Sequence, residues 1–314
     1  MQRIRPLRVA LVGLAASGCS LVLPTTSYTD PLPSSDAGAG GTGAGDAGDP
    51  GAPCGSVMAA PTGYSAEQRV FQDSFCGHDL ASQWLGSMPG FNNQGRLKPP
   101  LTGPNAGGYE SEYYDPAQIT VNDGLRLTAV PDPTTQTGYS AKSGVITTKQ
   151  TIKDIVGARS TQRLYLQASV RTSSKNGMWP KIYLGPLVGV DAVPIIVMST
   201  GFADVTSGTP LGNIDLAVGN ANAYYDTNTD LSGSFSEFGV EIVWGTSVTW
   251  FWKGTMVRTV SAASASIPAS GENETLFIAL SVINGRDGSS SWHTVWNGSD
   301  QDVFEVASVQ IYAQ

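Results

Sequence analysis

The stretch at residues 240–260, VEIVWGTSVTWFWKGTMVRTV, constrains the fold more than any other part of the chain. Apolar and polar side chains alternate in three short runs, and Gly245 and Gly254 interrupt these runs where a chain would reverse. Because alternate side chains of a β-strand share a face, this pattern predicts successive antiparallel strands with Trp250 and Trp252 on one face. The stretch has none of the 3.6-residue apolar period of an amphipathic helix.

Similar short runs follow one another from about residue 68 to the end of the chain. Residues 119–130, ITVNDGLRLTAV, predict a hairpin, because Asn122-Asp123-Gly124 supplies the positive φ that tight turns need. Only SAEQRV at 65–70 suggests a helical turn. With 37 glycines and 19 prolines among 314 residues, the sequence predicts an all-β chain folded as a single two-sheet sandwich.

The N-terminus has the pattern of an export signal. Three arginines precede the apolar run VALVGLAA and a group of small residues, which together predict a signal peptide at residues 1–18, too short to remain as a membrane-spanning helix. Gly18 before Cys19 resembles a bacterial lipobox, and Ser20 resembles an outer-membrane sorting signal. We therefore expect Cys19 to carry lipid and the protein to reside in the cell envelope as an outer-membrane lipoprotein. Cleavage without lipid is the alternative, since Ala16 stands where a lipobox usually has Leu; the protein would then be periplasmic or secreted.

Residues 19–56 are predicted to be a disordered linker. The segment 24–56 consists almost entirely of Gly, Ala, Pro, Ser, Thr and Asp, and such a chain buries too little apolar surface to offset its ordering entropy. Without residues 1–18 the chain keeps 15 basic and 26 acidic residues, a net charge of −11. This acidity argues against nucleic acid and anionic lipid surfaces as partners, and leaves the N-terminal lipid as the only expected link to a membrane.

The remaining cysteines, Cys54 and Cys76, form an even pair in an exported chain. We expect them to form a disulfide, because an oxidising compartment favours paired thiols. Two free thiols are the alternative.

Several segments, in order, resemble glycoside hydrolase family 16, the concanavalin A-like jelly-roll domain of laminarinases and lichenases. The resemblance runs from about residue 70 to the end and implies a jelly-roll domain at 65–314. It implies a cleft that binds β-linked polysaccharide. The matching segments are FQDSF (71–75), ESEYYDPAQITVNDGLRLTA (110–129), YSAKSGVITTK (139–149), YLQASVRTSSKNGMWPKIYL (165–184), FSEFGVEIVWGTSVTWFWKGTMVRTV (235–260) and FEVASVQIY (304–312).

The family's catalytic motif, Glu-x-Asp-x-(x)-Glu, is missing where the resemblance places it. Alternate residues of one strand bring the three acids into the cleft, and a bulge absorbs the optional residue. Here VPIIVMSTG occupies that place, with Val193, Ile195 and Met198 at the acid positions. A second register, GNIDLAVGN at 212–220, puts Asn213, Asp215 and Ala217 at those positions, and its spacing to the following strands is too short. Both registers lack a nucleophile and an acid/base.

Other titratable residues give weaker indications. Glu110 and Glu112 are two apart on one predicted strand that borders the family's cleft, so they are the best relocated catalytic pair, although exposed edge-strand charges are the favoured interpretation. Asp191 is expected in a loop, and His78 and His293 have no partner at metal-ligand or nucleophile spacing. The family often binds Ca²⁺ through an Asp in its last strand, where this chain has Ala307. We therefore expect no metal and no cofactor.

A cleft without acids can still bind sugar on aromatic rings. Trp179 and Tyr183 lie on the strand that forms the cleft floor in the family, and residues two or four apart on a strand point the same way. Trp292, His293 and Trp296 lie in a polar segment near the place where the family contributes a cleft tryptophan. The sequence thus predicts a monomeric, non-catalytic binder of a β-linked polysaccharide. A β-glycan hydrolase or transglycosylase with relocated acids, and a surface scaffold lipoprotein, are the alternatives.

Overall fold

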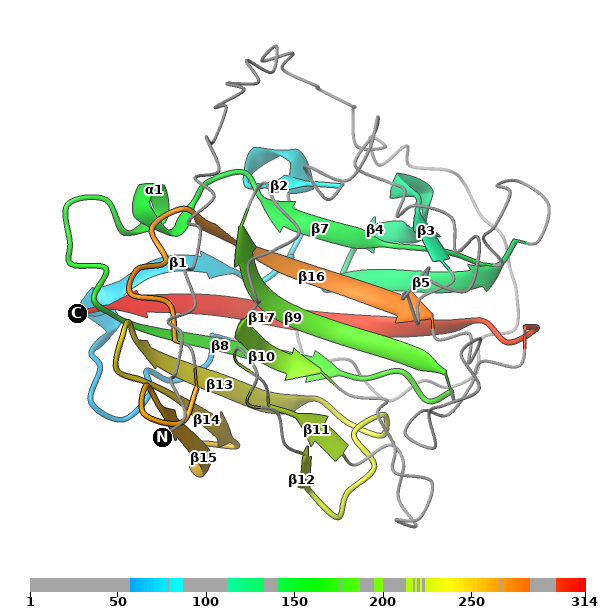
Figure 1. The fold of residues 1–314 in the computed structure, drawn as a ribbon. Helices are drawn as coiled ribbons and strands as arrows, with labels where there is room; N and C mark the ends of the chain where they lie inside the picture. Colours follow the sequence, from blue (N-terminus) through cyan, green and yellow to red (C-terminus); the bar gives the residue numbers. More distant parts are fainter. Residues whose placement is uncertain are drawn as a thin grey trace, which may run out of the picture. The chain divides into compact units, whose positions relative to one another are not determined.

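A computed structural model of the chain shows a β-sandwich (Figure 1). All described residues belong to one compact unit, Pro31–Gln314. The structure describes residues 57–77, 79–86, 112–132, 141–175, 177–186, 195–199, 213–216, 218, 221, 224–265, 267–282 and 298–314.

A ten-stranded sheet, called the large sheet below, forms one layer (Figure 1). Neighbouring strands in this sheet run antiparallel, except that β3 and β6 run parallel to each other. Outside the main order, β1 (Arg69–Asp73) pairs with β17 and β4 (Ile119–Val121) pairs with β5. The main order is β15 (Thr255–Ser261), β14 (Ser247–Trp252), β13 (Ser236–Val243), β8 (Arg163–Arg171), β17 (Asp302–Ala313), β5 (Leu125–Pro131), β6 (Ala141–Ser143) and β3 (Glu112–Tyr114).

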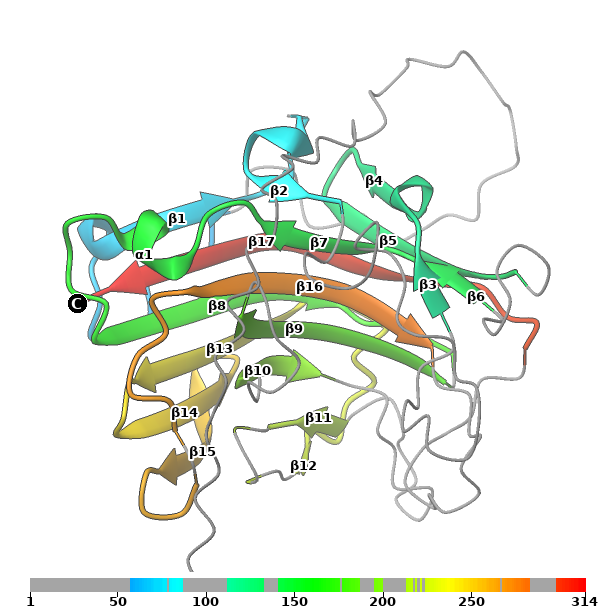
Figure 2. The same cartoon turned by 45° about the horizontal axis from the view of Figure 1, so that its top comes forward.

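A five-stranded antiparallel sheet, the small sheet, forms the second layer (Figure 2). Two further short strands, β11 (Asn213–Asp215) and β12 (Tyr224–Asp226), pair with each other. The order in the small sheet is β10 (Ile195–Ser199), β9 (Met178–Pro186), β16 (Glu274–Val282), β7 (Val145–Thr148) and β2 (Trp84–Leu85).

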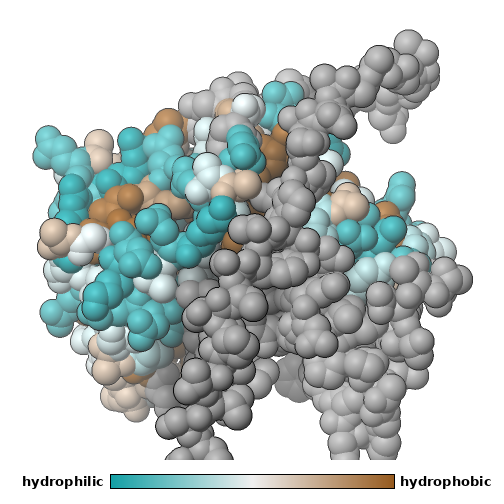
Figure 3. Space-filling view, turned by 90° about the horizontal axis from the view of Figure 1, so that it is seen from above, coloured by the Kyte–Doolittle hydropathy of each residue, from teal (hydrophilic) through white to brown (hydrophobic). Residues whose placement is uncertain are grey.

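The core fills the space between the two sheets. Period-two alternation decides which side chains enter it: on β9, Met178, Ile182 and Leu184 are buried in the core cluster, and on β8 Leu164 and Leu166 meet them from the large sheet. Burying such side chains stabilises the fold by about 1.5–3 kcal/mol each. On the face seen in Figure 3, most of the described surface is hydrophilic, with smaller hydrophobic areas between. Among the described residues, the exposed large hydrophobic side chains are Val57 and Met256. The predicted all-β two-sheet sandwich is confirmed.

The glycine-marked turns form as predicted. Gly245 and Gly254 have φ of 65° and 73° in the turns on either side of β14. β4 and β5 pair through Val121 and Leu125, so residues 122–124 form the hairpin loop, with φ of 131° at Gly124. A side chain is strained at such positive φ values, and glycine is not.

The helical content exceeds the prediction. The segment at 65–70 does form a 3-10 turn, Ala66–Gln68, but two more follow at Leu80–Ser82 and Pro116–Gln118, and α1 spans Ile152–Val156. Expecting helical structure only at 65–70 was therefore wrong. The missed signal for α1 is a capping box, in which the Thr151 hydroxyl accepts from the Asp154 backbone N–H and the Asp154 carboxylate accepts from the Thr151 backbone N–H.

Residues 57–64 form a strap across the outer face of the large sheet, the face turned away from the core. Gln167 Nε2 donates to the Ala59 carbonyl at 2.9 Å, and the Tyr64 hydroxyl donates to Glu241 at 3.3 Å. The Tyr64 ring packs with Tyr165 and Tyr312 on that face. The packed part of the chain therefore begins before residue 65.

Candidate functional site

The outer face of the small sheet, turned away from the core, carries the predicted stacking residues. On β9, Trp179, Lys181 and Tyr183 alternate with the core residues, so all three point to this outer face. Each is half-buried. On the neighbouring strand, Phe277 and Ser281 have the same orientation and are almost completely buried. The structure thus places Trp179 and Tyr183 on one face, as the sequence predicts.

The indole of Trp179 is held by two neighbours. Its Nε1–H donates to the hydroxyl of Ser199 on β10, which fixes the ring plane. The ammonium of Lys181 lies 3.3 Å from the ring centroid, so one face of the indole makes a cation–π contact. A sugar that stacks on Trp179 must use the other face or displace the ammonium.

Tyr183 is half of an aromatic stack. Its ring lies parallel to that of Phe277, directly opposite on β16, with centroids 5.0 Å apart and an interplanar angle of 8°. Burial, and then the negative charge of Glu112, raise the pKa of the Tyr183 phenol above its usual value. The hydroxyl therefore stays protonated near neutral pH and can donate a hydrogen bond.

The favoured prediction for Glu112, an exposed charge on an edge strand, is wrong. Its side chain is completely buried, and its Oε2 accepts a hydrogen bond from the Val282 backbone N–H at 2.9 Å. Burial first, and the Glu112 charge second, raise the pKa of neighbouring Tyr114, whose hydroxyl lies 3.1 Å from that of Ser281. This carboxylate therefore fastens β3 of the large sheet to the end of β16, and its proposed partner Glu110 lies outside the described residues.

The register predicted for the missing acid motif needs a one-residue correction. Ile195 and Met198 are buried in the core, opposite Leu184 and Ile182, so they do not face outward. The residues opposite the outward-facing Tyr183 and Lys181 are Ile196 and Ser199. A bulge between Ile196 and Met198 accounts for the spacing. Ser199 is therefore the described side chain of β10 on the outer face, and no residue of this strand carries a carboxyl group.

The second register is excluded by topology. Asn213 and Asp215 lie on β11, which pairs with β12 rather than with any strand of the small sheet. Across the five strands of the small sheet the single carboxylate is Glu274, at the start of β16 and opposite Pro186. By alternation it lies on the side of Leu276, a core residue, and burial raises its pKa.

Several predicted residues cannot be placed because they lie outside the described ranges. Cys76 is disulfide-bonded, and its pairing with Cys54 remains a prediction. Ala307 is buried in β17. Among the residues that the structure describes, no group of three or more His, Cys, Asp or Glu could hold a metal ion, and no helix is long and apolar enough to cross a membrane. The predicted residues outside the description are Cys19, Cys54, His78, Glu110, Asp191, Val193, Ala217, Trp292, His293 and Trp296.

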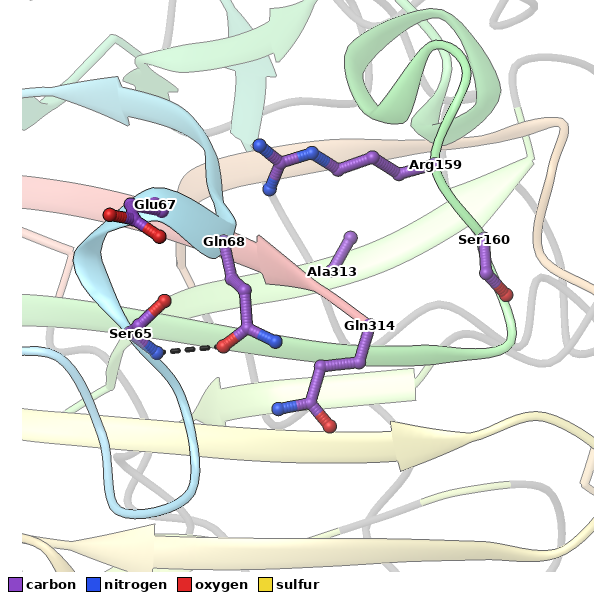
Figure 4. A pocket seen from close by; sticks show the side chains of 7 residues that line it. All are labelled: Ser65, Glu67, Gln68, Arg159, Ser160, Ala313 and Gln314. Carbon is purple, nitrogen blue, oxygen red and sulfur yellow. Dashed lines mark hydrogen bonds between the residues drawn. The ribbon is translucent and has the colours of Figure 1, made fainter.

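A separate hollow of about 580 Å³ lies where the C-terminus meets the 3-10 turn Ala66–Gln68 (Figure 4). Its lining is polar, with the guanidinium of Arg159 and the carboxylate of Glu67 among amide and hydroxyl groups. It has no aromatic ring, so it lacks the stacking surface that sugar recognition uses.

Comparison with known proteins identifies the fold. No protein-family model matches the chain, and no curated protein sequence matches it. Among solved structures, similar ones include a lichenase from a mouse hindgut metagenome (16% identity, TM-score 0.57, covering 78% of this chain and 99% of that one). The laminarinase catalytic domain of Thermotoga maritima has 15% identity and a TM-score of 0.58, over 78% and 98% of the two chains. A family 16 endo-glucanase from Bacteroides ovatus has 18% identity and a TM-score of 0.54, over 77% and 99%.

The class that these observations define is the concanavalin A-like jelly roll. Within it, the domain has the fold of the glycoside hydrolase family 16 glucanases, which confirms the resemblance read from the sequence. Identities of 15–18% establish the fold and leave the activity to be argued from the site.

Proposed function

We propose that the protein binds a β-linked polysaccharide on the outer face of the small sheet and does not cleave it. The fold is one that enzymes acting on β-glucans share. The half-buried rings of Trp179 and Tyr183 lie on that face beside the ammonium of Lys181, which is a hydrogen-bond donor, as is the protonated Tyr183 hydroxyl.

The residues of β10 are the observation that supports binding without cleavage. A retaining glycosidase needs two carboxyl groups about 5–5.5 Å apart, one as nucleophile and one as acid/base. None of the residues of β10, Ile195–Ser199, carries a carboxyl group, and neither an apolar side chain nor a serine hydroxyl replaces an acid/base of tuned pKa.

A hydrolase or transglycosylase with relocated acids is the second candidate, and Glu112 is the observation that favours it. This carboxylate lies close enough to Tyr114 and Tyr183 to raise the pKa of both phenols. Its complete burial and its hydrogen bond to Val282 argue for a structural role, because a catalytic acid must reach the glycosidic oxygen.

Two assays on the purified full-length chain distinguish cleavage of a glycan from binding without cleavage. Incubation with laminarin, lichenan and xylan should release no new reducing ends, while electrophoresis through gels containing the same glycans should retard the protein. Trp179→Ala should weaken the retardation. Trp252→Ala, which changes a half-buried tryptophan of the large sheet, should leave it intact. New reducing ends that disappear in Glu112→Gln would establish the hydrolase instead, and retardation that Trp179→Ala leaves unchanged would refute the binding face.

We also propose that the protein is an exported lipoprotein, acylated at Cys19 and held in the outer membrane. The support is the sequence pattern of residues 1–20. Mass spectrometry of the N-terminal peptide from membrane fractions should show a diacylated cysteine, and an unmodified N-terminus there would contradict the proposal.

A further inference from the structure

A second recess lies on the opposite side of the sandwich, between the strap and the outer face of the large sheet. It has a volume of about 190 Å³, and its walls combine strap residues 59–62 with side chains of β8, β13 and β14. This is smaller than the roughly 300 Å³ at which pockets for drug-sized ligands begin, so one ring of a ligand fits rather than several.

A glycine in the sheet, Gly239, shapes the floor of this recess. In one row across the strands, Phe251 of β14, Gly239 of β13 and Gln167 of β8 lie side by side. Gly239 leaves a gap that the Tyr165 hydroxyl enters, since a Cβ at position 239 would lie 2.2 Å from that oxygen. The half-buried ring of Phe251, 5.4 Å from the Tyr165 ring, provides an apolar wall.

The polar groups of the recess are mostly acceptors. Both amide hydrogens of Gln167 are donated, to the Ala59 carbonyl at 2.9 Å and to Gln310 Oε1 at 2.7 Å, which leaves Gln167 Oε1 to accept. The carboxylate of Glu237 is exposed at the rim and forms no ion pair within the described part of the chain. The Tyr165 hydroxyl makes no hydrogen bond to any described residue.

This combination selects for a ligand with hydroxyl donors around an apolar face. A pyranose ring has that chemistry, because its hydroxyls donate to Gln167, Glu237 and Tyr165 while its C–H face packs on Phe251. We propose that this recess is a second glycan site, which holds one sugar ring on the outer face of the large sheet. It shares no residue with the site on the small sheet, and the proposal does not rest on that site.

The test uses full-length protein and isothermal titration with laminaritetraose, cellotetraose and xylotetraose. Tyr165→Phe removes only the hydroxyl and should weaken binding of at least one sugar about 2- to 12-fold, the worth of one hydrogen bond. Phe251→Ala should weaken the same sugar. Tyr225→Phe, a matched change at a half-buried tyrosine of β12, should have no effect.

Sensitivity to Tyr165→Phe and Phe251→Ala, but not to Trp179→Ala, supports this recess and refutes the small-sheet site. The reverse pattern overturns the recess alone. The proposal is also overturned if none of the three sugars binds, or if Nα-acetyl-lysine binds in a Glu237-dependent manner while the sugars do not, because the recess would then be a cation site.

Discussion

Introducing a carboxylate at position 198 or 199 tests the corrected register of β10. Met198 is completely buried in the core, so Met198→Glu places an unpaired acid among apolar side chains. An uncompensated buried charge costs about 3–5 kcal/mol. Ser199 faces outward and lies opposite Lys181, so Ser199→Glu loses the hydrogen bond from Trp179 but gains an ammonium neighbour. Extra volume at this buried position costs about 1–3 kcal/mol.

The assay is thermal unfolding followed by near-ultraviolet circular dichroism at pH 7. One kcal/mol shifts the melting temperature of a domain of this size by about 2–4 °C, so Met198→Glu should lower it by about 6–20 °C. Met256→Glu is the matched control, because Met256 is 63% exposed and the same change there should cost no more than about 0.5 kcal/mol.

The pH dependence discriminates between the two positions more sharply than the size of the shift. The buried, unpaired carboxyl that Met198→Glu introduces has a pKa above its usual value, so its penalty is absent below about pH 4.3 and grows as pH rises. The carboxyl that Ser199→Glu introduces is also buried, but the Lys181 ammonium beside it opposes the effect of burial on its pKa, so its penalty grows less as pH rises. On going from pH 7 to pH 4, Met198→Glu should recover relative to wild type, and Ser199→Glu should recover less. A larger recovery for Ser199→Glu would refute the corrected register.

Two further predictions concern the core and its edge. Gly271→Ala should destabilise the domain by about 1–3 kcal/mol in chemical denaturation, because the new Cβ would lie 1.9 Å from the Trp244 ring. Gly233→Ala is the control and should be nearly neutral, because its Cβ meets only a carbonyl oxygen at 3.7 Å. Equal losses of stability in the two variants would contradict the packing around Gly271. Burial raises the pKa of Glu274 above 4.5, so wild-type stability falls as pH rises from that value. Glu274→Gln removes the ionisable group and should therefore flatten the pH profile of the melting temperature. An unchanged profile would show that this carboxyl is solvated.

The sequence was sufficient for the architecture because the strand patterns and turn residues agree with each other. Gly124, Gly245 and Gly254 all occur where the chain reverses, and the alternation at 240–260 correctly puts Trp250 and Trp252 on one face, which is the core side. Each signal is local, so it can be read even though the similar solved structures share only 15–18% of their residues with this chain.

The face of β10 could not be predicted, for a physical reason. Residues 193–198, VPIIVM, are apolar throughout, so no alternation shows which side chains face the core. The bulge between Ile196 and Met198 then shifts the parity within the strand. Family spacing alone left the register uncertain by one residue, and only pairing with β9 resolved it.

The role of Glu112 was also beyond the sequence. Charged residues near a sheet edge are usually exposed, and nothing local shows that the Val282 backbone N–H, 170 residues away, lies within hydrogen-bond distance. The same limit applies to the strap and the recess beneath it, because the contacts of Gln167 with Ala59 and of Tyr64 with Glu241 join segments far apart in the chain.

The two candidate sites lie on opposite outer faces of the sandwich. Val57, the first described residue, belongs to the segment that crosses the outer face of the large sheet, whereas Trp179 lies on the outer face of the small sheet, across the core. Val57 therefore lies on the side of the domain away from Trp179. Two sites so arranged would bind separate glycan chains rather than adjacent rings of one chain.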